Sequence, residues 1–286
     1  MKCLFPIKLH DRFGKLLEVP CGHCYVCKKT RSKEWAFRLM CENLEHKSAI
    51  YITLTYAPEF ITNVPDAPPP FYATLYPKDL TDFFKRLRFY LGERKFRYYA
   101  CGEYGGETKR PHYHAIIFNL DFCDTPLIEK AWSKGFTKVE EVNVATISYV
   151  AGYVQKKLYG SDVYPDCIVP PFSRMSKSIG KKYFQEHCEE IWNNGLHFQG
   201  YRIKVPRYYF RLLEDNKIGD KKLYEVVQKK KENALKSEQA AELNLARRFG
   251  YLEESDDKGF FRIRKAESQR DYWDRKEELF NDRSKI

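Results

Sequence analysis

The chain has 286 residues, a length typical of one large domain or two small ones. Its 43% hydrophobic and 16% aromatic content is sufficient for a buried core and excludes a wholly disordered protein. Fifty Lys and Arg against 39 Asp and Glu give a formal charge of +11. Such a charge indicates a polyanionic partner, nucleic acid first and a membrane surface second.

A membrane or secreted protein is not expected from this sequence. No apolar run approaches the roughly 20 residues that cross a bilayer, and residues 1–15 lack the apolar stretch of a signal peptide. We therefore expect a reducing cytoplasm, in which the nine cysteines serve as thiols or metal ligands rather than as disulfides.

Hydrophobic periodicity predicts alternating helices and strands after a cysteine-rich start. In chain order, the pattern predicts a helix at 29–46, a strand at 49–56, a helix at 78–91, a hairpin of strands at 96–104 and 112–119, a helix at 126–134, a strand at 136–143 and a helix at 145–158. The first helix carries an apolar stripe at Trp35, Leu39, Met40 and Leu44. This order predicts an α+β fold, with helices on one side of a mainly antiparallel sheet.

Four segments follow from this pattern. Residues 1–28 are expected to form an N-terminal Cys-rich zinc-binding element and residues 29–160 the catalytic core. Residues 161–220 are expected to be an extension packed on that core. Residues 221–286 hold 17 Lys and Arg and 14 Asp and Glu, so we expect a charged helical or partly disordered tail.

Three cysteines in the first segment follow the spacing C-x2-C-x2-C, and they are Cys21, Cys24 and Cys27. Structural zinc sites normally have four ligands. Cys41 lies about 21 Å farther along an intact helix at 1.5 Å per residue, which excludes it. Cys3 is therefore the favoured fourth ligand, with His23 as the alternative.

Two histidines in a predicted strand form a second candidate metal site. Side chains alternate between the faces of a strand, so His112 and His114 point the same way and Tyr113 points to the opposite face. The hairpin turn brings Glu103 across from them. Two imidazoles and one carboxylate leave coordination positions open, as catalytic metal sites do. The alternative is two polar residues on a solvated face and a turn residue at Glu103.

Two tyrosines and a lysine share one stripe of the last predicted helix. At 100° per residue, Tyr153 lies about 40° from Tyr149, and Lys156 about 20° to the other side. A phenol with a pKa near 10 is a poor nucleophile unless positive charge stabilises its oxyanion. A metal, tyrosines and a lysine are thus the groups needed for covalent cleavage of DNA. The alternative is an ordinary Tyr and Lys surface of a basic protein.

These segments, taken in order, resemble the three motifs of HUH endonucleases of the replication-initiator class. The first is 51–56, the second His112-Tyr113-His114, and the third Tyr149-x3-Tyr153-x2-Lys156. Three further matches narrow the resemblance to replication initiation proteins of the Microviridae, especially the gokushovirus type: Cys21-Gly-His-Cys24-Tyr-Val-Cys27, Gly102-Glu-Tyr-Gly with Arg110-Pro-His-Tyr-His-Ala, and Phe172-Ser-Arg-Met-Ser. The resemblance covers roughly residues 1–210.

The resemblance implies a fold, a reaction and a set of ligands. The fold is an HUH core with an RRM-like or ferredoxin-like palm. The enzyme nicks the origin, joins a tyrosine to the 5′-phosphate and leaves a 3′-OH that primes rolling-circle synthesis. His112, His114 and Glu103 would hold Mg²⁺ or Mn²⁺, while Tyr149 and Tyr153 alternate as nucleophiles.

Other parts of the chain acquire roles by the same resemblance. Lys156 would be the electrostatic partner of the tyrosines, and the cysteine cluster would hold Zn²⁺. The expected partners are single-stranded and origin DNA, with host helicase and polymerase, in the cytoplasm of the bacterial host. One departure is Gly152, where many relatives are expected to carry a lysine.

Basic residues on the first two predicted helices suit contacts with the phosphates and bases of an unpaired strand. They are Lys28, Lys29, Arg31, Lys33, Arg38, Lys85, Arg86 and Arg88. A non-enzymatic, zinc-dependent DNA-binding regulator is the alternative function, but it leaves the histidine and tyrosine pairs without a role. A transposase or relaxase of the same superfamily is a third, although relaxases usually carry an additional histidine in the metal motif.

Overall fold

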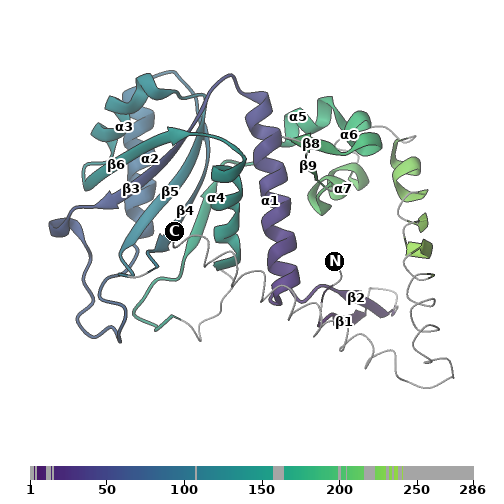
Figure 1. Cartoon of the computed structure of the whole chain (residues 1–286), viewed down its shortest axis with the longest axis horizontal. Coiled ribbons are helices and arrows are strands. Elements are labelled where there is room, and N and C mark those ends of the chain that lie inside the picture. The colour runs from purple at the N-terminus through teal and green to yellow at the C-terminus, as the bar shows by residue number, and fades with distance from the viewer. Residues whose placement is uncertain are drawn as a thin grey trace. The chain divides into compact units, whose positions relative to one another are not determined.

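The computed structural model describes residues 3, 5–10, 14, 16–106, 108–156, 164–198, 201–203, 205–215, 223–229, 232–233, 235–237 and 240, with the backbone alone at 25, 153–156, 197–198 and 201–203. The chain divides into two compact units. One comprises Met1–Cys27 and Lys221–Ile286, and the other comprises Lys28–Asp220. Each unit is described separately below (Figure 1).

A five-stranded antiparallel sheet forms the centre of the larger unit, with the strand order β6-β3-β5-β4-β7. The strands are β3 (Ala49–Tyr56), β4 (Arg97–Tyr104), β5 (Pro111–Phe118), β6 (Gly135–Glu141) and β7 (Phe172–Met175). Helices α2 (Pro77–Leu91) and α3 (Thr125–Ala131) connect β3 to β4 and β5 to β6. This β-α-β-β-α-β order is the ferredoxin-like arrangement, which confirms the predicted α+β class.

One face of the sheet packs against α2 and α3. Alternate residues of β3 and β5 point to this face, together with the apolar stripe of α2 and the indole of Trp132. The buried cluster includes Ile50, Ile52, Leu54, Tyr113, Ala115, Ile117, Leu80, Phe83, Leu87, Ile128 and Trp132. Burial of this much apolar surface is the main force that holds the helices on the sheet.

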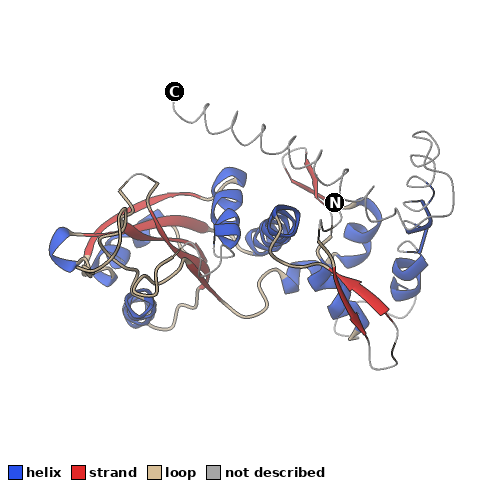
Figure 2. Cartoon of the chain, turned by 90° about the horizontal axis from the view of Figure 1, so that it is seen from below, coloured by secondary structure: helices blue, strands red, loops and turns tan. Residues whose placement is uncertain are grey.

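Helices also cover the opposite face, which corrects the expectation of helices on one side only (Figure 2). Helix α1 (Tyr25–Glu45) places Trp35 with its ring centroid 5.0 Å from that of Tyr99. Helix α4 (Val144–Lys156) packs on β4, β5 and β7. The reason is visible in the run Ala115–Phe118, which is apolar at every position and needs burial on both faces.

Residues beyond the predicted core complete the larger unit. Strand β7 comes from the segment 161–220, so this segment contributes a strand to the sheet. The remaining elements are α5 (Lys181–Glu186), α6 (Cys188–Asn194), β8 (Leu196–Phe198), β9 (Tyr201–Ile203) and α7 (Arg207–Glu214), with short 3-10 turns at Pro58–Phe60 and Phe122–Asp124. Phe37 of α1 packs on Phe184 and Tyr209, whereas Leu44 is exposed, contrary to its predicted place in the apolar stripe.

The smaller unit contains a hairpin that the sequence pattern did not predict. Strands β1 (Ile7–His10) and β2 (Leu16–Val19) pair antiparallel. Residues 223–229 are helical. Most of the predicted charged tail, including all residues after 240, lies outside the described part of the chain.

Candidate functional site

The hairpin β4–β5 brings together a carboxylate and two imidazoles. Glu103 pairs in register with His112, and the Nε2 atoms of His112 and His114 lie 3.0 and 3.2 Å from Glu103 Oε1. Glu103 and His114 are buried, and His112 is partly exposed. The alternation of strand β5 sends Tyr113 to the other face, where it is fully buried. The structure thus assembles the group that the sequence pattern predicted.

The second nitrogen of each imidazole is also engaged. His112 Nδ1 lies 3.0 Å from the carbonyl oxygen of Arg110. His114 Nδ1 lies 2.6 Å from the hydroxyl of Tyr51 and 3.0 Å from that of Thr53. A proton on Nδ1 can be accepted by each of these oxygens, which leaves Nε2 as the ligand atom. Such outer partners orient metal-binding histidines in proteins generally.

The donor and acceptor pattern fits a bound cation. His112 faces an acceptor on both sides, the Arg110 carbonyl and the Glu103 carboxylate. A neutral imidazole has one proton and satisfies only one of them. A divalent ion between Nε2 and the carboxylate satisfies the second, because the nitrogen then donates its lone pair to the metal. The three ligand atoms lie within 4.8 Å of one another. Two nitrogens and one oxygen suit Mn²⁺ and related ions and leave open coordination positions.

Tyr51 and Thr53 are positioning residues that the sequence analysis placed in a motif without assigning a role. Both lie on β3, in the strand next to His114. Burial raises the pKa of Tyr51, so its phenol stays neutral at physiological pH and holds a hydrogen bond to the imidazole. The signal in the sequence was the parity of the strand, since positions 51, 53 and 55 share the face of the histidine pair.

We expect Tyr51→Phe to weaken Mn²⁺ binding by about 10- to 100-fold, because the imidazole of His114 loses the hydroxyl that orients it. Titration of Mn²⁺ into the purified protein measures this directly. Tyr99→Phe is the matched control, since Tyr99 is buried on the same sheet face but is not a partner of either histidine in the described contacts. Equal Mn²⁺ affinity for wild type and Tyr51→Phe would contradict the role assigned to Tyr51.

Tyr149 lies directly against the candidate metal ligands. It is on α4, its side chain is 52% exposed, and its ring centroid is 5.5 Å from that of His114. Helix α4 begins after Asn143, whose side-chain oxygen accepts from the Thr146 N–H at 2.9 Å, a typical N-terminal cap. Tyr153 and Lys156 lie on the last turns of the same helix, and their side chains are outside the described part of the structure.

The four predicted zinc ligands also converge, within the smaller unit. The Sγ atoms of Cys3 lie 3.4 Å from Cys21 and 3.8 Å from Cys24, and Cys21 lies 4.0 Å from Cys27. Zinc–sulfur bonds of about 2.3 Å in a tetrahedron place sulfurs about 3.8 Å apart. These cysteines therefore fit Zn²⁺.

The remaining candidates for the fourth ligand are treated differently by the fold. Cys41 is fully buried in α1, and His23 is exposed and outside the group. Burial alone would raise the pKa of Cys21, but the N–H groups of Cys24 and His23 donate to its sulfur and lower that pKa to about 7. A thiolate at neutral pH is the form that binds a metal.

We expect the protein to hold about one Zn²⁺ per chain and Cys24→Ser to lose it, because three thiolates do not close a structural site. The midpoint of thermal unfolding should fall by at least about 5 °C. Metal analysis and calorimetry check the two results. Cys123→Ser serves as the control, since Cys123 is exposed and outside the cluster. A zinc-free wild type with unchanged stability would refute the assignment.

The predicted DNA-binding residues are divided by the fold. Arg31 and Lys33 are exposed on α1 and Lys29 is partly exposed, while Lys28 is buried, which argues against a phosphate contact at Lys28. Arg38 is engaged within the protein, because its Nε donates to the Ile179 carbonyl at 3.1 Å.

The three basic residues of α2 require a further correction. Lys85 and Arg88 are exposed, and Arg86 donates to the Ala131 carbonyl at 2.7 Å. Helix α2 packs on the sheet face opposite to Glu103 and the histidine pair. These residues therefore do not border the candidate metal site, although the sequence analysis placed them in one basic surface with α1.

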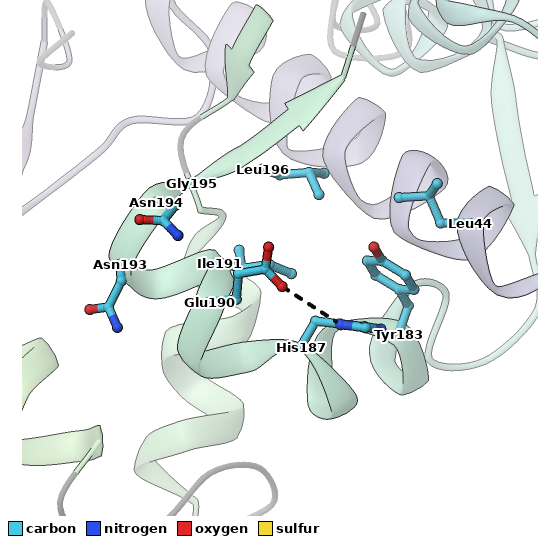
Figure 3. Close-up of a pocket in the computed structure, with 9 residues that line it drawn as sticks. All are labelled: Leu44, Tyr183, His187, Glu190, Ile191, Asn193, Asn194, Gly195 and Leu196. Atoms are coloured by element: carbon cyan, nitrogen blue, oxygen red, sulfur yellow. Dashed lines mark ion pairs between the residues drawn. The ribbon is translucent and has the colours of Figure 1, made fainter.

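A pocket of about 670 Å³ lies elsewhere in the larger unit (Figure 3). Helices α5 and α6 line it together with Leu44 and Leu196, and His187 lies 4.0 Å from Glu190 at its wall. None of its lining residues belongs to either candidate metal group. The candidate chemistry thus resides on the sheet and not in this pocket.

Comparisons with known proteins agree with the motifs. A sequence model of the replication-associated protein ORF2 family matches residues 49–158. The chain is 33% identical over 225 residues to Replication-associated protein ORF2 of Spiroplasma virus 4, with 68% of each chain covered. It is 30% identical to Replication-associated protein VP4 of Bdellovibrio phage phiMH2K, covering 66% of this chain and 65% of that protein.

A third relative is Replication-associated protein ORF4 of Chlamydia phage 1, which is 27% identical over 68% of this chain and 53% of its own length. No solved structure matches the chain. Within the described residues, no helix combines the length and apolar character required to cross a bilayer. By its identity to these relatives, the chain belongs to the family of Microviridae-type phage replication-associated proteins.

Proposed function

We propose that this protein initiates rolling-circle replication of a phage genome by nicking one DNA strand at the origin and rejoining it after synthesis. The observation that carries the proposal is the position of Tyr149, with its ring 5.5 Å from that of His114 and beside the group of Glu103, His112 and His114. A potential nucleophile and a candidate cation site thus share one sheet face. The names of the relatives support a role in replication.

Glu103, His112 and His114 would hold Mg²⁺ or Mn²⁺, which supplies positive charge to a phosphodiester when it is bound. The oxygen of Tyr149 or Tyr153 attacks the phosphorus, and the bond from phosphorus to the 3′ oxygen breaks. The phenol proton ends on that 3′ oxygen, so the products are a 5′-phosphotyrosine and a 3′-OH. Lys156 supplies charge near the phenols.

The reaction exchanges one phosphoester bond for another and is therefore reversible. The 3′-OH primes synthesis by a host polymerase, with a host helicase to open the duplex, in the cytoplasm of the bacterial host. The second tyrosine cleaves the regenerated origin after one round, and the waiting 3′-OH attacks the first phosphotyrosine. Two phenols on one helix suit this alternation.

The experiment is to incubate the full chain with labelled single strands from the phage genome, with and without Mn²⁺. We expect a covalent adduct at one sequence, formed only with the metal and linked to the 5′-phosphate. Tight binding without cleavage would favour the zinc-dependent regulator, which the cysteine cluster alone also supports. Cleavage that leaves an unattached 5′-phosphate would overturn the tyrosine mechanism.

A further inference from the structure

Edge strand β6 carries two exposed side chains on the same face as the candidate metal site. Phe136 is 65% exposed, and the side chain of Lys138 is 70% exposed. Residues directly opposite in neighbouring strands share a face. Phe136 pairs with Thr55, which pairs with His112, which in turn pairs with Glu103. Four side chains thus form one row across four strands.

The next row has the same arrangement. Lys138 pairs with Thr53, and Thr53 pairs with His114. Strands in a sheet lie about 4.8 Å apart, so both rows extend roughly 10 Å from the histidines to β6. Tyr149 of α4 borders the rows at His114. Thr53 and Thr55 are partly exposed between these ends.

An isolated exposed phenylalanine needs no explanation, but this one lies in register with a candidate catalytic group. The core-facing residues of β6 behave normally, since Val139 packs on the buried cluster. The exposed face of β6 therefore bears an aromatic ring and an ammonium group where an unpaired strand would leave the metal site. Aromatic rings stack on any base, and lysines contact phosphates.

We propose that Phe136 and Lys138 form a binding subsite for single-stranded DNA, in which a base next to the scissile phosphate stacks on Phe136 and a phosphate lies on Lys138. The inference rests on the proposed function, because it places the scissile phosphate at Glu103, His112 and His114. Stacking explains how the strand can be held beside the metal without sequence readout at this position. The ion pair of Lys138 with Glu140, at 3.0 Å, is exposed and is replaced by the phosphate contact.

Fluorescence anisotropy with labelled oligo-dT, in the absence of divalent metal, tests the subsite. We expect Phe136→Ala to bind about 5- to 100-fold more weakly than wild type, and Phe136→Trp to bind at least as well as wild type. Lys138→Ala should reduce the slope of log affinity against log salt by about 0.7. Phe89→Ala is the matched control, since Phe89 is 81% exposed but lies on α2, on the opposite side of the sheet.

A fully abasic strand of the same length separates stacking from a change in fold. Phe136→Ala and wild type should bind this strand equally, because it has no base to stack. Equal affinity of the two proteins for oligo-dT would overturn the inference, as would an equal loss on the abasic strand. An absence of covalent adducts in wild type alongside the expected Phe136 effect would refute the proposed nicking function alone.

Discussion

We expect the double variant His112→Ala with His114→Ala to lose DNA nicking by at least about a thousandfold while it retains most of its DNA affinity. A divalent cation at a phosphodiester contributes several kcal/mol to the transition state, and each 1.36 kcal/mol corresponds to a factor of ten in rate. Glu103 alone does not hold such an ion. DNA affinity comes mainly from Lys and Arg contacts with phosphates, which this change leaves in place.

The measurement is the rate of adduct formation on the origin strand, with binding followed separately by anisotropy. His187→Ala is a suitable control, because His187 lies in the pocket formed by α5 and α6 and is outside both metal groups. Brief chelation should also stop nicking, and Mn²⁺ alone should restore it while the cysteine cluster keeps its zinc. Nicking at the wild-type rate by the double-histidine variant would exclude this site.

The double variant Tyr149→Phe with Tyr153→Phe should form no covalent adduct, since both phenol oxygens are absent. Each single variant should keep a first cleavage, at a full or reduced rate, but fail in repeated cleavage and strand transfer. Two phenols one helical turn apart can reach the same phosphate after a small shift. Lys156→Ala should slow adduct formation by about 10- to 100-fold with little change in DNA affinity, because one exposed charge adds little binding but stabilises developing charge locally.

Mass spectrometry of the digested adduct should place the nucleotide on residues 149–153. Tyr72→Phe is the matched control, since Tyr72 is an exposed tyrosine of the loop before α2. An adduct on another residue, or an adduct formed by the double-tyrosine variant, would refute the mechanism. The ferredoxin-like fold and the membership of the replication-associated family would be unaffected by that result.

Local features of this protein could be read from its sequence because backbone geometry sets them. Strand β3 occupies the predicted 49–56, and β4 and β5 begin and end within one residue of prediction. The alternation of side chains in a strand placed His112 and His114 on one face and Glu103 opposite. The spacing C-x2-C-x2-C and the reach of an intact helix selected Cys3 over Cys41.

Features that join distant parts of the chain were decided by the tertiary structure. The sheet gained β7 from beyond the predicted core, and α1 and α4 covered its second face. The basic residues of α2 were separated from the metal site, because the apolar stripe of that helix packs on the other face. Phe136 and Tyr51 acquired their places beside the histidines only through strand order and register.

The physical reason for this division is the range of the interactions involved. Periodicity and spacing follow from 3.6 residues per helical turn and two per strand repeat, so they are written in consecutive residues. The order of strands and the face that each helix covers follow from the burial of apolar surface between residues far apart in sequence. The sequence by itself therefore determined the candidate ligands and nucleophiles, and the tertiary structure decided which of them share a face.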